Sequence, residues 1–305
     1  MTKIMRLPAA TTCRAGRCSS VSARRSDLWL RVAAGLIGLV AALALTPARA
    51  EMPARVVSLN VCTDQLAVML AAPGQIAAVS RLSMDPRSSA IVEQARDLPK
   101  VATDAEQIFL LRPDLVLAGR YTERATVSML RRLGVRVETF DHGSTLADIR
   151  RDVTRMGTLL GRADRAAQVL AEFDAALARL RPPPDADRPR SVTYGANGWT
   201  AGQSGLSAEI LRAAGHDNAA LAAGFPFGGH LPLEVLVLTA PDFILTPSPY
   251  PGGSRAEDAP AHPAVDRISG ATRLTLGMDQ HWTCATPHII TAVAALRRAA
   301  DEAGR

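Results

Sequence analysis

Two glutamates occupy matching positions in a pattern that occurs twice in the chain. Glu106 and Glu234 each precede a Pro-Asp pair by seven residues, an apolar run follows each pair, and the two copies lie 128 residues apart. Each glutamate falls near the start of a short predicted helix, where the helix dipole favours a negative charge. Stabilisation of its own helix would explain one such glutamate. Repetition at matching positions favours a second role, a charged contact point for a partner.

Other residue types that could do chemistry lack the spacing of a catalytic or metal site. The glycine-rich segment 195–205 lacks the Gly-Lys-Ser/Thr ending of a P-loop and misses the G-x-S-x-G pattern of a hydrolase by one residue. The six histidines form no H-E-x-x-H pattern and no i,i+4 pair, although His142, His230 and His281 merit attention. We therefore expect no enzyme, no resident cofactor and no bare metal site.

The elements that would position these residues alternate between strand and helix. The first half predicts strands near 55–59, 76–79, 115–118 and 135–140 with helices between them, and the alternation begins again after a proline-rich break at 182–189. Such alternation is typical of parallel sheets covered by helices. Strands at 191–194 and after Glu234, a late strand at 273–276 and a helix at 287–303 complete the second half. The chain is therefore predicted to be an α/β protein with two similar lobes.

A long helical stretch separates the two halves. It predicts one helix over 146–160 and a second over 163–181, whose apolar residues follow helical spacing. At 1.5 Å per residue the second helix would be about 28 Å long, enough to join two lobes; an ordinary surface helix of one lobe is the alternative. The predicted organisation is an N-terminal lobe at 51–144, linking helices at 145–184 and a C-terminal lobe at 185–305.

The first 50 residues have the parts of a secretory signal. A basic region reaches Arg31, an apolar core of 14 residues covers 32–45, and Ala48-Arg49-Ala50 is a cleavage site that makes Glu51 the mature N-terminus. A short N-terminal anchor is the alternative, and Arg24-Arg25 leaves the twin-arginine route open beside the general secretory route. Without this segment, 27 of the 35 basic and 28 of the 29 acidic residues remain. The +6 net charge therefore does not indicate nucleic-acid binding. The signal segment predicts a mature protein that is soluble outside the cytoplasm, and the resemblance described next implies the periplasm.

Several motifs in order resemble a known family of binding proteins. They are the opening Arg-Val-Val-Ser-Leu, the two glutamate units, the run at 211–218 and a Trp-to-Pro stretch at 282–287 before the last helix. Over residues 54–303 the chain is similar to the helical-backbone class (class III) of periplasmic substrate-binding proteins, which serve ABC importers of vitamin B12 and iron–siderophores. The resemblance implies two Rossmann-like α/β lobes joined by a single long α-helix, with the ligand cleft between the lobes.

The same resemblance implies a function. The protein would be a monomeric carrier, not an enzyme, that delivers a cobalamin-like or iron–siderophore ligand to the inner-membrane permease. Glu106 and Glu234 would dock on arginines of that ABC permease. A haem carrier of the same fold is a further possibility, with Tyr121, His230 or His281 as axial ligands. An exported enzyme on this scaffold is the competing class.

Ligand contacts are expected in loops beyond the carboxyl ends of the strands, where open α/β sheets bind. These positions hold aromatic, cationic and polar side chains, which suit a bulky organic ligand with anionic or chelating groups. For any single aromatic, local packing is an equally good explanation. In lobe one the candidates are Asn60, Cys62, Thr63, Arg81, Met84, Arg120 and Tyr121; the later ones are Asn197, Trp199, Phe225, Phe227, His230, His281, Trp282 and Cys284.

Cys62 and Cys284 are the only cysteines beyond the signal segment. Buried free thiols are the ordinary state of an unpaired cysteine. A disulfide suits an oxidising compartment and would add roughly 5 kcal/mol, but we expect it to tie the cleft shut. Contact with a metal-bearing ligand is the third possibility. The sequence leaves all three open.

Overall fold

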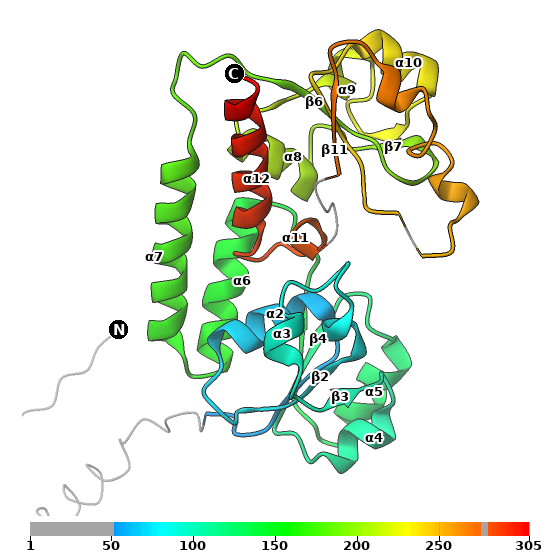
Figure 1. Cartoon of the computed structure of the whole chain (residues 1–305). Coiled ribbons are helices and arrows are strands. Elements are labelled where there is room, and N and C mark those ends of the chain that lie inside the picture. The colour runs from blue at the N-terminus through cyan, green and yellow to red at the C-terminus, as the bar shows by residue number, and fades with distance from the viewer. Residues whose placement is uncertain (1–51, 250, 276–279, 305) are drawn as a thin grey trace, which may run out of the picture. The chain divides into compact units, whose positions relative to one another are not determined.

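The computed structural model describes residues 52–249, 251–275 and 280–304 (Figure 1). The predicted secretory signal and its cleavage site before Glu51 lie outside these residues. Within the described ranges, no helix is both long and apolar enough to cross a membrane. The described chain consists of two α/β lobes and a layer of helices beside them, which agrees with the predicted fold class.

Lobe one is built on a five-stranded parallel sheet of order β3-β2-β1-β4-β5. Its two central strands, β1 and β4, are buried along their whole length, as near-continuous apolar runs predict. The strands are β1 (Val56–Ser58), β2 (Ile76–Ser80), β3 (Lys100–Val101), β4 (Leu115–Gly119) and β5 (Val137–Phe140). The helices are α2 (Val61–Leu70), α3 (Val92–Ala95), α4 (Ala105–Leu110) and α5 (Arg124–Arg132), with a 3-10 turn η1 (Arg81–Met84) after β2.

Lobe two repeats this topology on a smaller scale. Its parallel sheet has the order β11-β10-β6-β8, which matches β5-β4-β1-β2 of lobe one strand for strand. The strands are β6 (Arg190–Thr193), β8 (Asp217–Asn218), β10 (Phe243–Leu245) and β11 (Thr272–Leu274), and the helices α8 (Leu206–Ala213), α9 (Ala219–Ala222) and α10 (Leu233–Thr239). A separate antiparallel ribbon pairs β7 (Trp199–Thr200) with β9 (Gly229–His230).

The aspartate of the repeated Pro-Asp pair has the same structural role in both lobes. The Asp114 carboxylate accepts a hydrogen bond from the backbone N–H of Arg55 at 2.9 Å, just before β1. The Asp242 carboxylate accepts one from the backbone N–H of Arg190 at 2.7 Å, at the start of β6. Each aspartate therefore joins the strand that follows the glutamate helix to the first strand of its lobe.

The linking helices match the predicted ones closely. They are α6 (Leu146–Leu159), which begins with a capping box between Thr145 and Asp148, and α7 (Ala163–Leu180). Gly157 lets the two helices approach, because a Cβ at this position would lie 2.4 Å from the Cβ of Ala166. α7 runs past both α6 and the C-terminal helix α12 (Ile289–Glu302) and leads into β6 (Figure 1).

The main hydrophobic core is continuous between the lobes. One cluster of buried residues includes Leu117 of lobe one, Val153 of α6, Phe173 of α7, Leu296 of α12 and Phe243 of lobe two. Smaller clusters fill the outer faces of each sheet. The lobes are therefore joined by packed helices and not only by a chain crossing.

Candidate functional site

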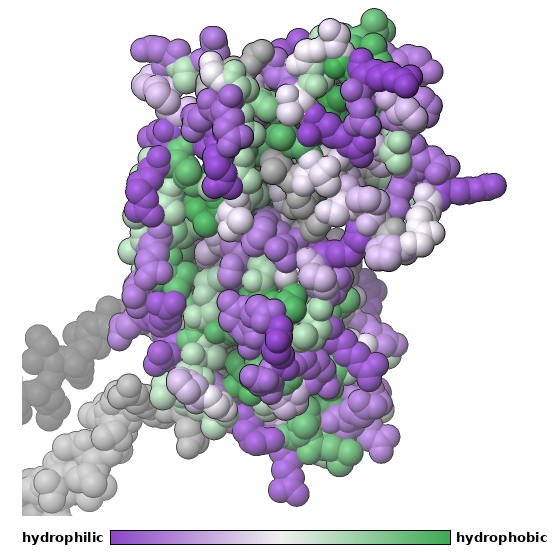
Figure 2. Space-filling model, in the orientation of Figure 1, coloured by the Kyte–Doolittle hydropathy of each residue, from purple (hydrophilic) through white to green (hydrophobic). Residues whose placement is uncertain are grey.

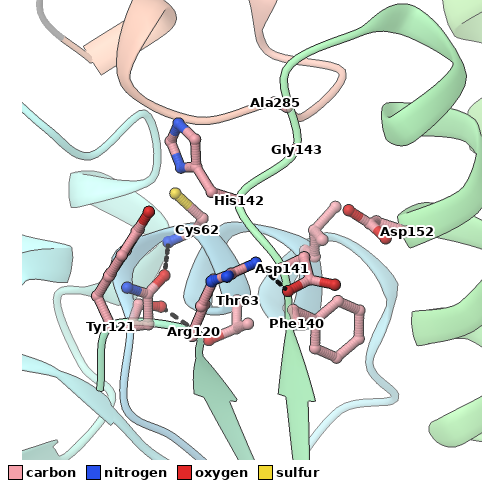
Figure 3. Close-up of a pocket in the computed structure, with 13 residues that line it drawn as sticks. Cys62, Thr63, Arg120, Tyr121, Phe140, Asp141, His142, Gly143, Asp152 and Ala285 are labelled. Atoms are coloured by element: carbon pink, nitrogen blue, oxygen red, sulfur yellow. Dashed lines mark hydrogen bonds and ion pairs between the residues drawn. The ribbon is translucent and has the colours of Figure 1, made fainter. Parts of the chain in front are cut away.

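A pocket opens in lobe one where three parallel strands end (Figure 3). After β1, the N-cap and first turn of α2 contribute Asn60, Cys62 and Thr63. The loop after β4 contributes Arg120 and Tyr121, and the loop after β5 contributes Asp141, His142 and Gly143. This is the edge at which open α/β sheets bind ligands. The cavity has a volume of only about 60 Å³ and is partly open, so a ligand of drug size or larger would have to extend out of it.

The floor of the pocket is fixed by local hydrogen bonds. Asn60 is the N-cap of α2, and its side-chain oxygen accepts from the backbone N–H of Cys62 at 2.9 Å. The Thr63 hydroxyl donates to the carbonyl oxygen of Asn60 at 2.9 Å and also contacts the Ser58 hydroxyl at 2.8 Å. At Gly119 a Cβ would lie 2.8 Å from the Asn60 side chain, so glycine permits the close approach of the two loops.

The rim of the pocket carries an aromatic side chain and an imidazole. Tyr121 is 81% exposed, and its ring centroid lies 6.4 Å from that of His142. Figure 3 shows both side chains beside the Cys62 sulfur. Arg120 forms an ion pair with Asp141 at 3.4 Å, but both side chains are largely exposed. Such a pair contributes little to stability, which leaves the guanidinium available to an anionic group.

A second aromatic–imidazole pair lies on the ribbon of lobe two. Trp199 and His230 are register partners on β7 and β9, and their rings meet edge to face at 5.5 Å. The Nδ1 atom of His230 lies 3.1 Å from the carbonyl oxygen of Asn197, which adopts a left-handed backbone conformation. Phe227 nearby is 86% exposed, whereas Phe225 is half-buried and packs against the core of lobe two.

The carboxyl ends of the two sheets face one another. Arg87, in the loop after η1 in lobe one, donates hydrogen bonds to the carbonyl oxygens of Ser248 and Pro249, which follow β10 in lobe two. Loops beyond the strand ends of both lobes are therefore in contact. The sequence predicts the ligand cleft at this boundary, and the cleft itself stays a prediction.

Cys62 and Cys284 form a disulfide, with their Cα atoms 5.3 Å apart. The free-thiol and metal-contact alternatives are therefore wrong, and neither sulfur is a free ligand for a bound group. The expectation that this bond would tie the cleft shut stays a prediction, although Tyr121, which lines the same pocket as Cys62, is exposed. The disulfide joins lobe one to the segment that leads into α12.

This segment, residues 280–286, lies against lobe one although its place in the sequence suggested lobe two. The Thr286 hydroxyl donates to the side-chain oxygen of Gln65 at 3.0 Å in a buried contact, and Ala285 lines the lobe-one pocket. Trp282 is only 7% exposed and belongs to the main hydrophobic core, which argues against a direct ligand contact. His281 is half-buried on the same short helix, α11 (Gln280–Thr283).

The residues predicted as ligand contacts in lobe one lie in two places. Asn60, Cys62, Thr63, Arg120 and Tyr121 come together in the pocket. Arg81 and Met84 lie on η1 and do not line it: Arg81 is exposed, and Met84 packs against a small cluster beside β2.

The predicted set of site residues lacks eight that also line the pocket: Leu66, Gly119, Phe140, Asp141, His142, Gly143, Asp152 and Ala285. Asp141 directly follows a predicted strand, so the strand-end rule could have found it. Asp152 comes from the buried face of α6, where it pairs with Arg151 at 3.0 Å, and only the packing of α6 brings it to the pocket.

Beneath the pocket lies a buried carboxyl group. Asp64 on α2 is fully buried, and burial raises the pKa of its carboxyl to about 6. The Ser80 hydroxyl and backbone N–H both donate to it, at 2.5 and 3.2 Å. Because these bonds tie α2 to β2, we assign Asp64 a structural role. Across the described residues, no three His, Cys, Asp or Glu side chains are grouped so as to hold a metal ion.

Glu106 and Glu234 occupy the same position in their helices. Each is the second residue, of α4 and α10 respectively, and each is exposed. Neither lines the pocket. α4 lies at the outer end of lobe one and α10 at the outer end of lobe two (Figure 1).

Comparison with known proteins gives consistent results. The model of a family described as periplasmic binding protein matches residues 56–264. The cobalamin-binding protein of Halobacterium salinarum (strain ATCC 29341 / DSM 671 / R1) is 30% identical over 202 residues, which cover 64% of this chain and 54% of that protein. The chain thus spans about half the length of the curated relatives it matches.

Solved structures of similar fold include binding proteins for heme and for vitamin B12. The periplasmic heme-binding protein BhuT, in complex with two hemes, is 25% identical with a TM-score of 0.59, and the match covers 80% of this chain and 96% of that one. The periplasmic vitamin B12 binding protein BtuF of Vibrio cholerae is 20% identical with a TM-score of 0.56, over 83% and 98% of the two chains. At 20% identity, the similarity to the vitamin B12 binding protein concerns the fold alone.

Proposed function

Because the chain belongs to the periplasmic binding protein family, we propose that it is the solute-binding protein of an ABC importer. It captures a cobalamin-like or iron–siderophore ligand and delivers it to the inner-membrane permease, without catalysis. The observation that carries this proposal is the pair of aromatic–imidazole groups beyond the strand ends, Tyr121 with His142 and Trp199 with His230. The 30% identity to a protein named as cobalamin-binding supports the choice of ligand.

The shape of the site favours a large ligand over a small one. The cavity in lobe one is too small for a drug-sized ligand, while Tyr121, Trp199 and Phe227 expose broad apolar faces. Aromatic rings on both sides of a ligand bury much apolar surface at little cost in side-chain entropy. Arg120 at the rim would pair with a carboxylate or phosphate of such a ligand.

Calorimetric titration tests the proposal. Purified protein is titrated separately with cyanocobalamin, a ferric hydroxamate and haemin. We expect one of the first two to bind at one-to-one stoichiometry and to be recovered chemically unchanged. Tyr121→Ala or Trp199→Ala should weaken binding by on the order of tenfold, since an aromatic contact is worth about 1 kcal/mol beyond its buried area. Turnover of the ligand, or wild-type affinity in both variants, would refute the assignment.

Haem is the second candidate, and a specific observation favours it. The phenol of Tyr121 is exposed beside the imidazole of His142, and both groups can coordinate iron. Besides Tyr121, the predicted axial ligands are His230 and His281. Tyr121→Phe separates the two ligand types because it keeps the ring and removes only the oxygen. The visible spectrum of bound haem would change in this variant, whereas affinity for a corrinoid or hydroxamate would stay within about threefold.

Docking to the permease is the second part of the proposal. Glu106→Arg combined with Glu234→Arg would place like charges face to face with arginines of the permease, which can cost several kcal/mol at an interface. We expect normal ligand affinity but failed uptake in vesicles that contain the cognate importer. Glu123→Arg combined with Glu302→Arg is the matched control, because it changes the net charge equally at other exposed glutamates. Uptake at the wild-type rate in the first variant would refute the docking role.

We also propose that the mature protein is a periplasmic monomer that begins at Glu51. The apolar core at 32–45 and the Ala48-Arg49-Ala50 site support export by a cleaved signal. Intact-mass measurement of periplasmic protein should show the loss of 50 residues. Recovery of a form that retains residues 32–45 in the membrane fraction would contradict this.

A further inference from the structure

The two helices that carry the docking glutamates share a second feature, a pair of exposed apolar side chains. On α4, Phe109 is 44% and Leu110 is 73% exposed; on α10, Val237 is 45% and Leu238 is 82% exposed. In each helix the pair lies three and four residues after the glutamate. The two lobes therefore present the same arrangement at the same positions of the repeated unit.

The fold does not require these exposed side chains. One residue before each pair, Ile108 and Leu236 are fully buried and anchor their helices to the lobe cores. Single apolar residues scattered over a surface are normal and need no explanation. Here, however, α4 and α10 hold four of the twelve large apolar side chains that are exposed in the described part of the chain. Because they are concentrated at equivalent positions of the two lobes, we expect both pairs to have the same role.

Each pair lies on the same helical face as its glutamate. Residues three and four apart are neighbours on a helix surface, so each helix presents a carboxylate next to an apolar contact. Neither Glu106 nor Glu234 belongs to any ion pair formed within the described part of the chain. Apolar surface is visible over α4 and α10 at the two ends of the molecule (Figure 2).

We infer that Phe109–Leu110 and Val237–Leu238 are the apolar halves of two equivalent docking patches for the permease. The inference rests on the proposed function. Charge complementarity and the repeat describe the surface that the permease would present: two equivalent sites, each bearing a cation beside an apolar hollow. The glutamate orients the encounter, and the apolar pair, once desolvated, holds the complex. Two identical subunits of a permease meet this description, since a repeated patch fits a repeated surface.

Binding to the cognate permease in lipid nanodiscs tests the inference. Leu110→Ser combined with Leu238→Ser should lower the affinity of the ligand-loaded protein by about tenfold. Leu110→Met combined with Leu238→Met keeps apolar bulk at both sites and should bind within about twofold of wild type. Leu221→Ser, on an exposed apolar residue of α9, should have no effect. All variants are first checked for unchanged ligand affinity and thermal unfolding.

Salt dependence separates the two halves of each patch. The serine variant should lose affinity equally at low and high ionic strength, whereas the arginine variant of the glutamates should change the salt dependence itself. If the arginine variant weakens binding and the serine variant does not, the inference fails and the docking role of the glutamates stands. If neither variant changes the affinity, the docking part of the proposed function fails as well. Equal losses in the serine and methionine variants, or a change in self-association instead of permease affinity, would also overturn the inference.

Discussion

Removal of the disulfide is the most direct test of the architecture. The bond joins residues that are 222 positions apart in the sequence. On the chain-entropy model a cross-link of this separation restricts the unfolded chain by roughly 5 kcal/mol. A typical domain is stable by only about 5–15 kcal/mol, so Cys62→Ala combined with Cys284→Ala should remove a large share of the total. Alanine keeps the Cβ atom at both positions and removes only the two sulfur atoms, so the change to the native packing is small beside the lost cross-link.

Urea unfolding measures the effect. With a slope of about 2.5 kcal/mol per molar, a loss of 5 kcal/mol moves the midpoint down by about 2 M. Reduced wild-type protein is the matched control, and its midpoint should coincide with that of the double variant. Before reduction, denatured wild-type protein that lacks residues 1–50 should show no reactive thiol, and after reduction it should show two. If the midpoint moves by less than the equivalent of about 1 kcal/mol, or if thiols react without reduction, the cross-link or its stabilising role is refuted.

Three further predictions concern pH, packing and motion. Burial lowers the pKa of the His216 imidazole from 6.5 to about 4, so as pH falls through this window the unfolded chain takes up the proton before the folded protein does. The free energy of unfolding should therefore fall by about 3 kcal/mol from this group between pH 7 and pH 4. Unfolding measured at both pH values should show that His216→Asn lacks this part of the loss. Gly119→Ala should lower the free energy of unfolding by about 1–3 kcal/mol and weaken ligand binding, since the added Cβ would displace Asn60. Gly195→Ala is the control: the nearest atom to its Cβ would lie 3.7 Å away, so stability and binding should hardly change. Because α7 and its packed neighbours connect the lobes, small-angle scattering should change little when ligand binds, and a clear contraction would contradict a stiff connection.

Local patterns in the sequence were sufficient to predict the scaffold. Helical spacing of apolar residues predicted the two linking helices within one residue of α6 and α7. Short apolar runs after the Pro-Asp pairs predicted β4 and β10, and the repeat itself predicted two lobes of equal topology. These features depend on interactions between residues close in the chain, whose periodicity can be read directly. Strand ends in turn predicted where Asn60, Arg120 and Tyr121 lie.

Only the tertiary structure decided which distant residues meet. Nothing local distinguishes a free thiol at Cys62 from one bonded to Cys284, because pairing depends on a Cα separation of a few ångströms between distant segments. The same return of residues 280–286 to lobe one buries Trp282 in the core, although its sequence neighbourhood suggested the cleft. Asp152 reaches the pocket by helix packing, and the exposure of the apolar pairs on α4 and α10 follows from which face each helix buries. Composition and periodicity specify a segment's own conformation, whereas contacts between segments depend on how the whole chain excludes water from its core.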